Sequence, residues 1–293
     1  MNGFLLINKD KGPTSHDIVF KIRKIAKTRK VGHTGTLDPL ATGIMVVCIG
    51  NATKTADFIS GGDKAYIATM ELGLTSDTLD ITGEVTSLPE KSFKNEEIEA
   101  AILSFLGDNM QVPPMYSAKK VQGKKLYELA REGIEIERQP VPITIKEIKI
   151  IEIIEKKVKF YVLCTKGTYI RSLIDDIGKK LSYGAVMTDL KRVKSGNFSI
   201  ENAYTIEELE KMEGVEQLLL PIEAAFLDYP KIIVEPDIER LIKNGIIINL
   251  TRANIKNEYE DGLIRIYNNE NDFFALMRLE NGMLRLIKSF FTN

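Results

Sequence analysis

The chain has 293 residues, 44% hydrophobic and 28% charged, which suits one large globular domain or a main domain with a small addition. Its net charge is −1, and the two cysteines, Cys48 and Cys164, each lie in an apolar stretch, which argues against a disulfide framework and for a reducing compartment. The longest apolar run, 44–49, is far too short for a membrane span, and the N-terminal apolar stretch is too short for a signal peptide. We therefore expect a cytoplasmic protein without membrane contact.

Apolar periodicity predicts the elements of the first hundred residues. Thr14 and Ser15 offer an N-cap for the first helix, and alternation in 64–73 places Tyr66 on the same face as three apolar side chains. In chain order we expect a strand over 3–8, a helix over 16–27, a glycine- and threonine-rich loop over 32–43, strands over 44–49 and 64–73, and a polar loop over 76–95.

The remaining elements also mix helices and strands without a regular β-α-β period. This predicts an α+β fold with a mixed, largely antiparallel sheet flanked by helices. Expected are a helix over 96–106, a long proline-bounded segment over 112–142, a hairpin over 143–165, a helix over 170–181, a strand over 194–199 and a helix over 206–211. After a break near 228–230, short strands and a helix over 236–243 predict a small β-rich domain.

Basic residues are unevenly distributed along a chain whose net charge is almost zero. Residues 1–35 hold eight lysines and arginines against two aspartates. Two further clusters are Lys119, Lys120, Lys124 and Lys125, and Lys191, Arg192 and Lys194. Each cluster alone is typical of a solvated face, but three together favour a surface that follows the phosphates of a nucleic acid.

Several kinds of catalytic site have no support in the sequence. There is no glycine-rich phosphate loop, because no lysine stands where that motif requires one. The two histidines, His16 and His33, have no cysteine pair or acidic cluster at metal-ligand spacing. A Ser-His-Asp hydrolase would lack its elbow motif. We therefore expect neither metal nor nucleotide chemistry.

The loop over 32–43 is the remaining candidate for a site. Its glycines, at 32, 35 and 43, permit backbone conformations closed to other residues, and its threonines, at 34, 36 and 42, can bond locally and stiffen a turn. Pro39 fixes its own φ and restricts Asp38 before it. Such a loop can present one carboxylate rigidly. For an isolated Asp-Pro pair, the start of an ordinary turn is the more common explanation.

The string from Gly32 to Gly43, GHTGTLDPLATG, closely resembles the active-site loop of the bacterial TruB family, the pseudouridine synthases that modify uridine 55 in the T-loop of tRNA. Other family motifs follow in order and at matching spacing from residue 3 to about 200. They are the lysine-glycine-serine segment 8–15, the tyrosine strand 64–66, the insertion motif 113–131, and the segments 167–173 and 190–192. In the first of these, Asp10 stands where the family commonly has proline, so the resemblance assigns that segment no precise contact.

This resemblance implies the fold and the domain organisation. It predicts a pseudouridine synthase catalytic domain over residues 1–229, with an RNA-gripping insertion over about 112–142. Residues 230–293 match, more loosely, a reduced PUA-like RNA-binding domain. The insertion and the short tail favour a standalone enzyme over the guide-RNA-dependent relatives.

The resemblance also implies which residues carry the chemistry. Asp38 takes the place of the catalytic carboxylate, as a nucleophile or as the group that drives glycal formation. Arg171 is expected to pair with it, because an enclosed carboxylate keeps its charge when a cation lies close by. Tyr66 is expected to stack on the flipped base, and it is a candidate for the late proton transfer from C5. Without the resemblance, Arg171 would be assigned to the surface and Tyr66 to the core.

Three further residues are implied to bind the substrate. Tyr169 and Leu190 match positions that line the base pocket, although Leu190 alone would be assigned to the core. His33 matches a residue that helps to displace the target nucleotide, whereas a lone histidine is more often a structural hydrogen-bond partner.

The sequence thus predicts an isomerase that flips uridine 55, breaks the C1′–N1 bond, rotates the base and rejoins C1′ to C5. No redox change or group donor is involved, so no cofactor is expected. The predicted partner is tRNA, bound by its T-arm and with the acceptor stem as a further contact, and the protein is expected to be a monomer without an obligatory protein partner. The alternatives are a non-catalytic tRNA-binding or folding protein on the same scaffold and a carboxylate glycosidase. The glycosidase would need a second acid in a comparable loop, and none is evident.

Overall fold

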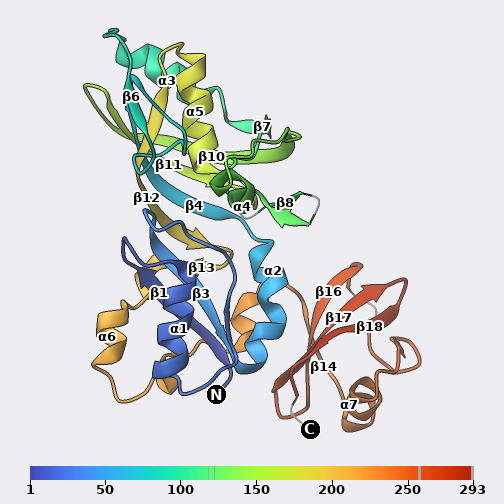
Figure 1. The fold of residues 1–293 in the computed structure, drawn as a ribbon. Coiled ribbons are helices and arrows are strands. Elements are labelled where there is room, and N and C mark those ends of the chain that lie inside the picture. Colours follow the sequence, from blue (N-terminus) through green and yellow to red (C-terminus); the bar gives the residue numbers. More distant parts are fainter. Residues whose placement is uncertain (118, 122, 257–258, 292–293) are drawn as a thin grey trace.

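The computed structural model describes residues 1–117, 119–121, 123–256 and 259–291, and it places their main strands in two sheets (Figure 1). The strands of the larger sheet are β1 Gly3–Lys9, β2 Val31–His33, β3 Thr42–Ile49, β4 Lys64–Leu72, β7 Gly107–Gln111, β10 Val141–Ile154, β11 Lys157–Cys164, β12 Ala185–Ser195 and β13 Phe198–Ser199. Their order is β1-β3-β12-β4-β11-β10-β7, with β2 paired to β3 and β13 to β12.

Antiparallel pairing dominates this sheet. The pair β3 and β12 is parallel, and every other pair in the order above is antiparallel. The expected hairpin is present as β10 and β11, and its turn contains Glu155, which has a positive φ of 51°. The prediction of an α+β fold with a largely antiparallel sheet is therefore confirmed.

The helices of the same body are α1 Ser15–Ile25, α2 Ala56–Ser60, α3 Asn95–Leu103, α4 Leu126–Arg131, α5 Ile170–Lys180 and α6 Ile206–Glu210, with short 3-10 turns at Gly50–Thr55, Ile200–Asn202, Glu216–Leu218 and Ile222–Ala225. A capping box starts α1: the Thr14 side chain accepts from the Asp17 N–H, and the Asp17 carboxylate accepts from the Thr14 N–H. The helix ends two residues earlier than predicted, since Lys27 has a left-handed φ of 48°.

Two of these helices cover the part of the sheet that contains Tyr66. Helices α3 and α5 lie side by side in Figure 1, and their apolar side chains share one core with β4, β10, β11 and β12. Helix α1 packs on β1 and β3 in a separate core. Helix α5 therefore packs against strands from three distant parts of the chain, namely β4, the hairpin of β10 and β11, and β12.

Strand β12 was largely missed by the sequence prediction, which placed a strand at 194–199. The observed strand spans eleven residues, and 196–197 form its turn into β13. Two register shifts against β4, between Met187 and Asp189 and between Arg192 and Lys194, interrupt the alternation of buried and exposed side chains. Since β12 also carries four charged residues, its apolar pattern is hidden in the sequence although it lies in the middle of the sheet.

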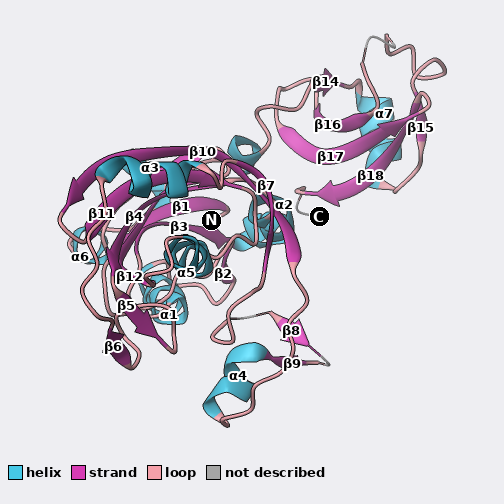
Figure 2. Ribbon diagram, turned by 90° about the horizontal axis from the view of Figure 1, so that it is seen from above, coloured by secondary structure: helices cyan, strands magenta, loops and turns pink. Residues whose placement is uncertain are grey.

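Two smaller hairpins lie outside the large sheet. The expected polar loop over 76–95 contains part of one, formed by β5 Leu74–Ser76 and β6 Val85–Ser87, so that expectation was wrong for β6. The other hairpin, β8 Lys120–Val121 with β9 Lys124–Lys125, leads into α4. Figure 2 shows this hairpin and α4 standing away from the large sheet. They belong to the segment expected to grip RNA.

The strands after residue 230 form a second sheet with its own apolar core. Its elements are β14 Lys231–Ile233, α7 Pro236–Lys243, β15 Ile248–Asn249, β16 Gly262–Tyr267, β17 Phe273–Glu280 and β18 Met283–Ser289. A small cluster around the buried Phe226 joins this sheet to the larger body, and Lys54 Nζ donates to Ser289 O (2.9 Å). The division at residue 229 and the PUA-like character of this part stay predictions. Within the described ranges, no helix is both long and apolar enough to cross a lipid bilayer.

Candidate active site

Asp38 lies in the segment between β2 and β3, and side chains from other elements fix the backbone of this segment. Ser60 Oγ at the end of α2 donates to Thr34 O (2.7 Å). Ser15 Oγ at the start of α1 donates to Leu37 O (3.1 Å) and accepts from the Leu37 N–H (2.8 Å). These hydrogen bonds fix the backbone before Asp38 at two points, Thr34 and Leu37.

The far side of the loop is bound by the end of β1. Lys9 Nζ donates to Ala41 O (2.7 Å) and Pro39 O (3.4 Å), and the Gly12 N–H also donates to Pro39 O (2.8 Å). Burial lowers the pKa of Lys9, while the nearby Asp38 acts in the opposite direction. Because Lys9 is fully buried, its assignment to a basic surface cluster was wrong.

Arg192 binds the middle of the loop from β12. Its Nε donates to Ile44 O (2.8 Å), Nη2 donates to Gly35 O (3.1 Å) and Nη1 donates to Thr36 O (3.5 Å). The side chain is 2% exposed, and burial lowers its pKa. The expectation that Arg192 belongs to a phosphate-binding surface was therefore wrong: its donors serve carbonyl groups inside the protein.

Local bonding contributes less to this loop than the sequence suggested. Among the described residues, the buried Thr34 hydroxyl has no hydrogen-bond partner, and Thr42 Oγ1 donates to Leu190 O at 3.4 Å. Of the three glycines, Gly43 is the one with a left-handed φ (100°), and a Cβ there would lie 2.2 Å from Arg192 O. The loop is fixed mainly by its distant partners.

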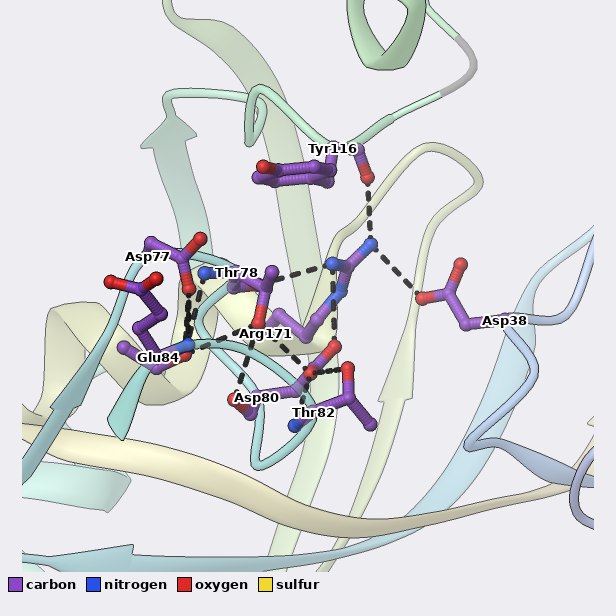
Figure 3. A network of polar contacts seen from close by, with 9 residues as sticks. Asp38, Asp77, Thr78, Asp80, Thr82, Glu84, Tyr116 and Arg171 are labelled. Carbon is purple, nitrogen blue, oxygen red and sulfur yellow. Dashed lines mark hydrogen bonds and ion pairs between the residues drawn. The ribbon is translucent and has the colours of Figure 1, made fainter. Parts of the chain in front are cut away.

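Arg171, the second residue of α5, lies at the centre of the polar network in Figure 3. Its Nη2 is 3.0 Å from Asp38 Oδ2 and donates to Tyr116 O at 2.8 Å. Its Nη1 donates to Thr78 O (3.1 Å) and to Asp80 Oδ2 (3.4 Å). The structure therefore brings Arg171 to Asp38 as expected. Three further acceptors also bind the guanidinium.

Asp80 is a second carboxylate on the same guanidinium, which the sequence reading missed. Its side chain is 5% exposed. Its Oδ1 accepts from Thr82 N–H (2.9 Å), Thr82 Oγ1 (2.5 Å) and Thr78 Oγ1 (3.0 Å). The statement that no second acid stands in a comparable loop was wrong. Asp80 is nevertheless no free acid or base, since both of its oxygens are occupied inside the protein.

Tyr66 points from β4 into the same site, beside Arg192. The two residues are direct partners across the antiparallel pair of β4 and β12, so their side chains leave the sheet on the same face. Both side chains line the same cleft. Burial raises the pKa of Tyr66, and the arginine acts in the opposite direction.

The three expected binding residues come from different elements. His33 ends β2, Tyr169 is the N-cap of α5 and Leu190 lies on β12. The Gly35 N–H donates to His33 Nδ1 (3.3 Å), which leaves Nε2 as the protonated nitrogen of a neutral ring. Burial lowers the pKa of His33, with His16 and Arg192 as smaller causes, and so favours that neutral form.

One cleft of about 1080 Å³ contains all of the predicted site residues. The cleft is lined by Asp38, Tyr66, Arg171, His33, Tyr169 and Leu190, and also by Asp80 and Arg192. Asp38 is 41% exposed, so its carboxylate faces this space, whereas the arginine beside it is 7% exposed. The arrangement presents one oriented carboxylate next to aromatic and apolar surface.

The expected RNA-gripping insertion reaches this cleft. Tyr116 and Ser117 line it, and Tyr116 lies next to Arg171 in Figure 3. At the base of the insertion, Gln111 Nε2 donates to Tyr169 O (3.1 Å) and the Tyr169 N–H donates to Gln111 Oε1 (2.8 Å). The insertion is thus bound to the start of α5 both at its base and through the Tyr116 carbonyl.

The exposed members of the basic clusters leave a smaller candidate surface than expected. In the first cluster all but Lys9 are exposed, and in the third Lys191 and Lys194 are exposed. Lys124 of the second cluster is exposed, while the side chains of Lys120 and Lys125 lie outside the described residues. The exposed lysines and arginines can still contact phosphates.

One signal in the sequence points to a residue that was missed. Asp80 is followed two residues later by Thr82 and then by Gly83, a pattern typical of an aspartate that accepts from the backbone two residues ahead. No comparable signal marks Arg192, whose Nη1 would lie 3.3 Å from a Cβ at Gly35. That close approach is evident only from the structure.

Comparison with known proteins identifies relatives along almost the whole chain. Residues 23–170 match the N-terminal domain of the TruB family of pseudouridylate synthases, and residues 171–227 match the C-terminal domain of tRNA pseudouridylate synthase B. The chain is 44% identical over 290 residues to the tRNA pseudouridine synthase B of Clostridium kluyveri. The aligned region covers 99% of this chain and 100% of that protein. It is 50% identical over 245 residues to the protein of the same name from Alkaliphilus oremlandii, covering 84% and 82%.

A solved structure shares the arrangement of the elements. The chain is similar to one in the crystal structure of a Cbf5-Nop10-Gar1 complex, with a TM-score of 0.75 and 25% identity over 98% of this chain and 84% of that chain. The likeness therefore extends beyond the large sheet and includes the second, smaller one.

Proposed function

Because the chain belongs to the TruB family of pseudouridylate synthases, we propose that it is a tRNA pseudouridine synthase that converts uridine 55 in the T-loop to pseudouridine. The observation that carries the proposal is the pair of Asp38 and Arg171, 3.0 Å apart in a cleft that also holds Tyr66. The enzyme is an isomerase: substrate and product contain the same atoms.

The reaction makes a specific demand on the protein. The C1′–N1 bond breaks, the uracil turns, C1′ joins C5, and the C5 proton leaves. Attack at C1′, attack at C6 and elimination to a glycal all need an ionised carboxylate beside the nucleotide. Asp38 meets this demand, since its oxygens face the cleft while Arg171 supplies a fixed positive charge. We assign Asp38 the role of the catalytic carboxylate and Arg171 that of its charge partner.

The other cleft residues suit a flipped pyrimidine. Tyr66 offers a flat ring on which the base can stack, with Tyr169 and Leu190 as further walls of the pocket. Extruding a base from a stacked loop costs a few kcal/mol, which contacts with the RNA must offset. We assign His33 to such a contact, because its neutral ring can present the Nε2–H group to the nucleotide.

We also propose how the RNA is held. The T-arm would lie over the cleft, between the insertion that carries Tyr116 and the exposed cations that follow β1, among them Lys11. Residues 230–293 would form a PUA-like RNA-binding domain, supported by their separate core, and would extend the contact toward the acceptor stem. The enzyme would act as a monomer in the cytoplasm, without a protein partner.

Two other functions fit parts of the site less well. A non-catalytic tRNA-binding or folding protein would not need Asp38, Tyr66 and Arg171 together in one cleft. A glycosidase would need two working carboxylates, and the oxygens of Asp80 are occupied by Arg171 and by two threonines.

A T-arm stem-loop RNA tritiated at uracil C5 separates these functions. A pseudouridine synthase releases tritium to water from position 55 and leaves the RNA chain intact. Binding without tritium release would favour the non-catalytic protein, and free uracil would favour the glycosidase. Either result would refute the proposal.

A further inference from the structure

Arg192 stands where the two halves of the site meet. Its backbone pairs with Gly43 on one side, just after the Asp38 loop, and with Tyr66 on the other. Arg192 therefore lies on β12, the strand between β3, which follows the Asp38 loop, and β4, which carries Tyr66.

The side chain makes the same connection a second time. The guanidinium donates to Gly35 O and Ile44 O on the loop segment. It also lines the cleft beside Tyr66, its cross-strand partner, and its positive charge opposes the rise in the pKa of the tyrosine that burial causes. Arginine suits this position, because a planar group with donors on three nitrogens can reach separate acceptors at once.

The two loop glycines beside Arg192 fit the same interpretation. A Cβ at Gly43 would lie 2.2 Å from the Arg192 carbonyl oxygen, and a Cβ at Gly35 would lie 3.3 Å from its Nη1. Glycine at these positions lets the loop approach both the backbone and the guanidinium of Arg192.

We propose that Arg192 is a positioning residue of the isomerisation, which holds the Asp38 loop and the Tyr66 hydroxyl in one frame and keeps the tyrosine oxygen ready to accept the C5 proton. This inference rests on the proposed function. It assigns the buried arginine to the reaction instead of to RNA binding.

The proton transfer defines what Arg192 must do. After C1′ has joined C5, that carbon still carries its proton, and the ring has a double bond between C6 and N1. Burial favours the neutral phenol, so Tyr66 first gives its hydroxyl proton to water. The resulting phenolate takes the C5 proton, the C5–H electron pair forms the C5–C6 double bond, and the C6–N1 electrons move to N1, which takes a proton from water. The positive charge of Arg192 stabilises the phenolate, and because arginine has donors only it cannot compete for the proton.

The test measures single-turnover rates on a T-arm stem-loop with hydrogen or deuterium at C5 of the target uridine. Arg192→Lys keeps a positive charge but offers one nitrogen in place of three. We expect its rate to fall by about 10- to 100-fold, the effect of losing a charge-assisted hydrogen bond. RNA affinity should change much less, and deuterium should slow the remaining reaction because cleavage of the C5–H bond now limits it.

A second variant and a control keep the result decisive. Gly35→Ala retains the arginine but crowds Nη1, so it should give a smaller loss of rate with the same sensitivity to deuterium. Lys191→Ala removes the exposed neighbouring cation and should weaken RNA binding without altering the isotope effect of the unaltered protein. If a thermal melt shows no unfolding transition for Arg192→Lys, the single-turnover rate of Gly35→Ala and its sensitivity to deuterium decide the result.

The inference is overturned if Arg192→Lys keeps its rate, or if its slow reaction is insensitive to deuterium. Failure of the proposed function looks different, because the unaltered protein would then release no tritium from position 55.

Discussion

The Asp38 carboxylate lies 3.0 Å from Nη2 of Arg171, yet the aspartate side chain is 41% exposed and the arginine 7%. The cation is fixed from behind by Asp80 and two carbonyl groups, so it can orient the carboxylate without covering it. A charge pair of this kind leaves one member available to a substrate while the other remains part of the protein interior.

Asp38→Asn should abolish conversion of uridine 55 while leaving tRNA affinity within about threefold, or about 0.6 kcal/mol of binding free energy. The amide has almost the same shape but cannot act as an ionised carboxylate. Tritium release and a filter-binding titration on the same preparation measure the two quantities. Turnover near that of the unaltered protein would exclude Asp38 as the catalytic carboxylate.

Arg171→Lys should lower turnover by about 100-fold or more, because one ammonium group cannot reach Asp38, Asp80 and two carbonyl groups at once. The free energy of unfolding should also fall, by about 2 kcal/mol, since the buried Asp80 loses part of its hydrogen bonding. Single-turnover kinetics and urea unfolding separate the two effects. Lys179→Ala is the matched control on α5: its ion pair with Asp175 is 69% exposed on the lysine side, so stability should change by less than about 0.5 kcal/mol.

Affinity for tRNA should fall steeply as salt concentration rises, because each phosphate contact releases counterions. Lys11→Ala should reduce the slope of log affinity against log salt by about one, since Lys11 is exposed next to the Gly12 contact with the Asp38 loop. Lys149→Ala, an exposed lysine outside the basic clusters, should leave the slope unchanged. An equal effect of both substitutions would contradict the proposed RNA path.

Lys64 gives a prediction about stability and pH. Burial lowers its pKa from 10.5 to about 8, although Nζ donates to Ser60 O (2.7 Å) and Gly62 O (2.5 Å). Between pH 8 and 10.5 the unfolded chain therefore binds more protons at this site, so the contribution of Lys64 to stability rises with pH. The unfolding free energy of the unaltered protein should increase relative to Lys64→Met by about 3 kcal/mol across this range. Urea unfolding at several pH values measures this, and a constant difference would contradict the lowered pKa.

Much of the fold follows from local patterns in the sequence. Strand β4, helix α5 and helix α7 were predicted within two residues at each end, because apolar side chains recur at the spacing of one element type. Strand β12 was missed where bulges and charged residues interrupt that spacing, and its place in the sheet is set by pairing with β3 and β4.

The site was predicted in a different way. Resemblance to a family located Asp38, Tyr66 and Arg171, and the structure brings them together in one cleft. The partners that hold them, Asp80 and Arg192, were missed or misassigned because their contacts join residues far apart in the chain, up to 157 positions for Arg192 and Gly35. No local pattern encodes such a pair.

The bonding of the Asp38 loop also constrains how the protein is made. During synthesis, β1, α1, α2 and the loop itself leave the ribosome first, but the carbonyl groups of Gly35 and Thr36 meet their donor only when Arg192 has emerged. Before that point the loop lacks the side chain that joins it to Tyr66, and long-range closure of this kind is slow. A nascent chain shorter than about two-thirds of the protein therefore lacks the bonds that hold this loop against the central strand.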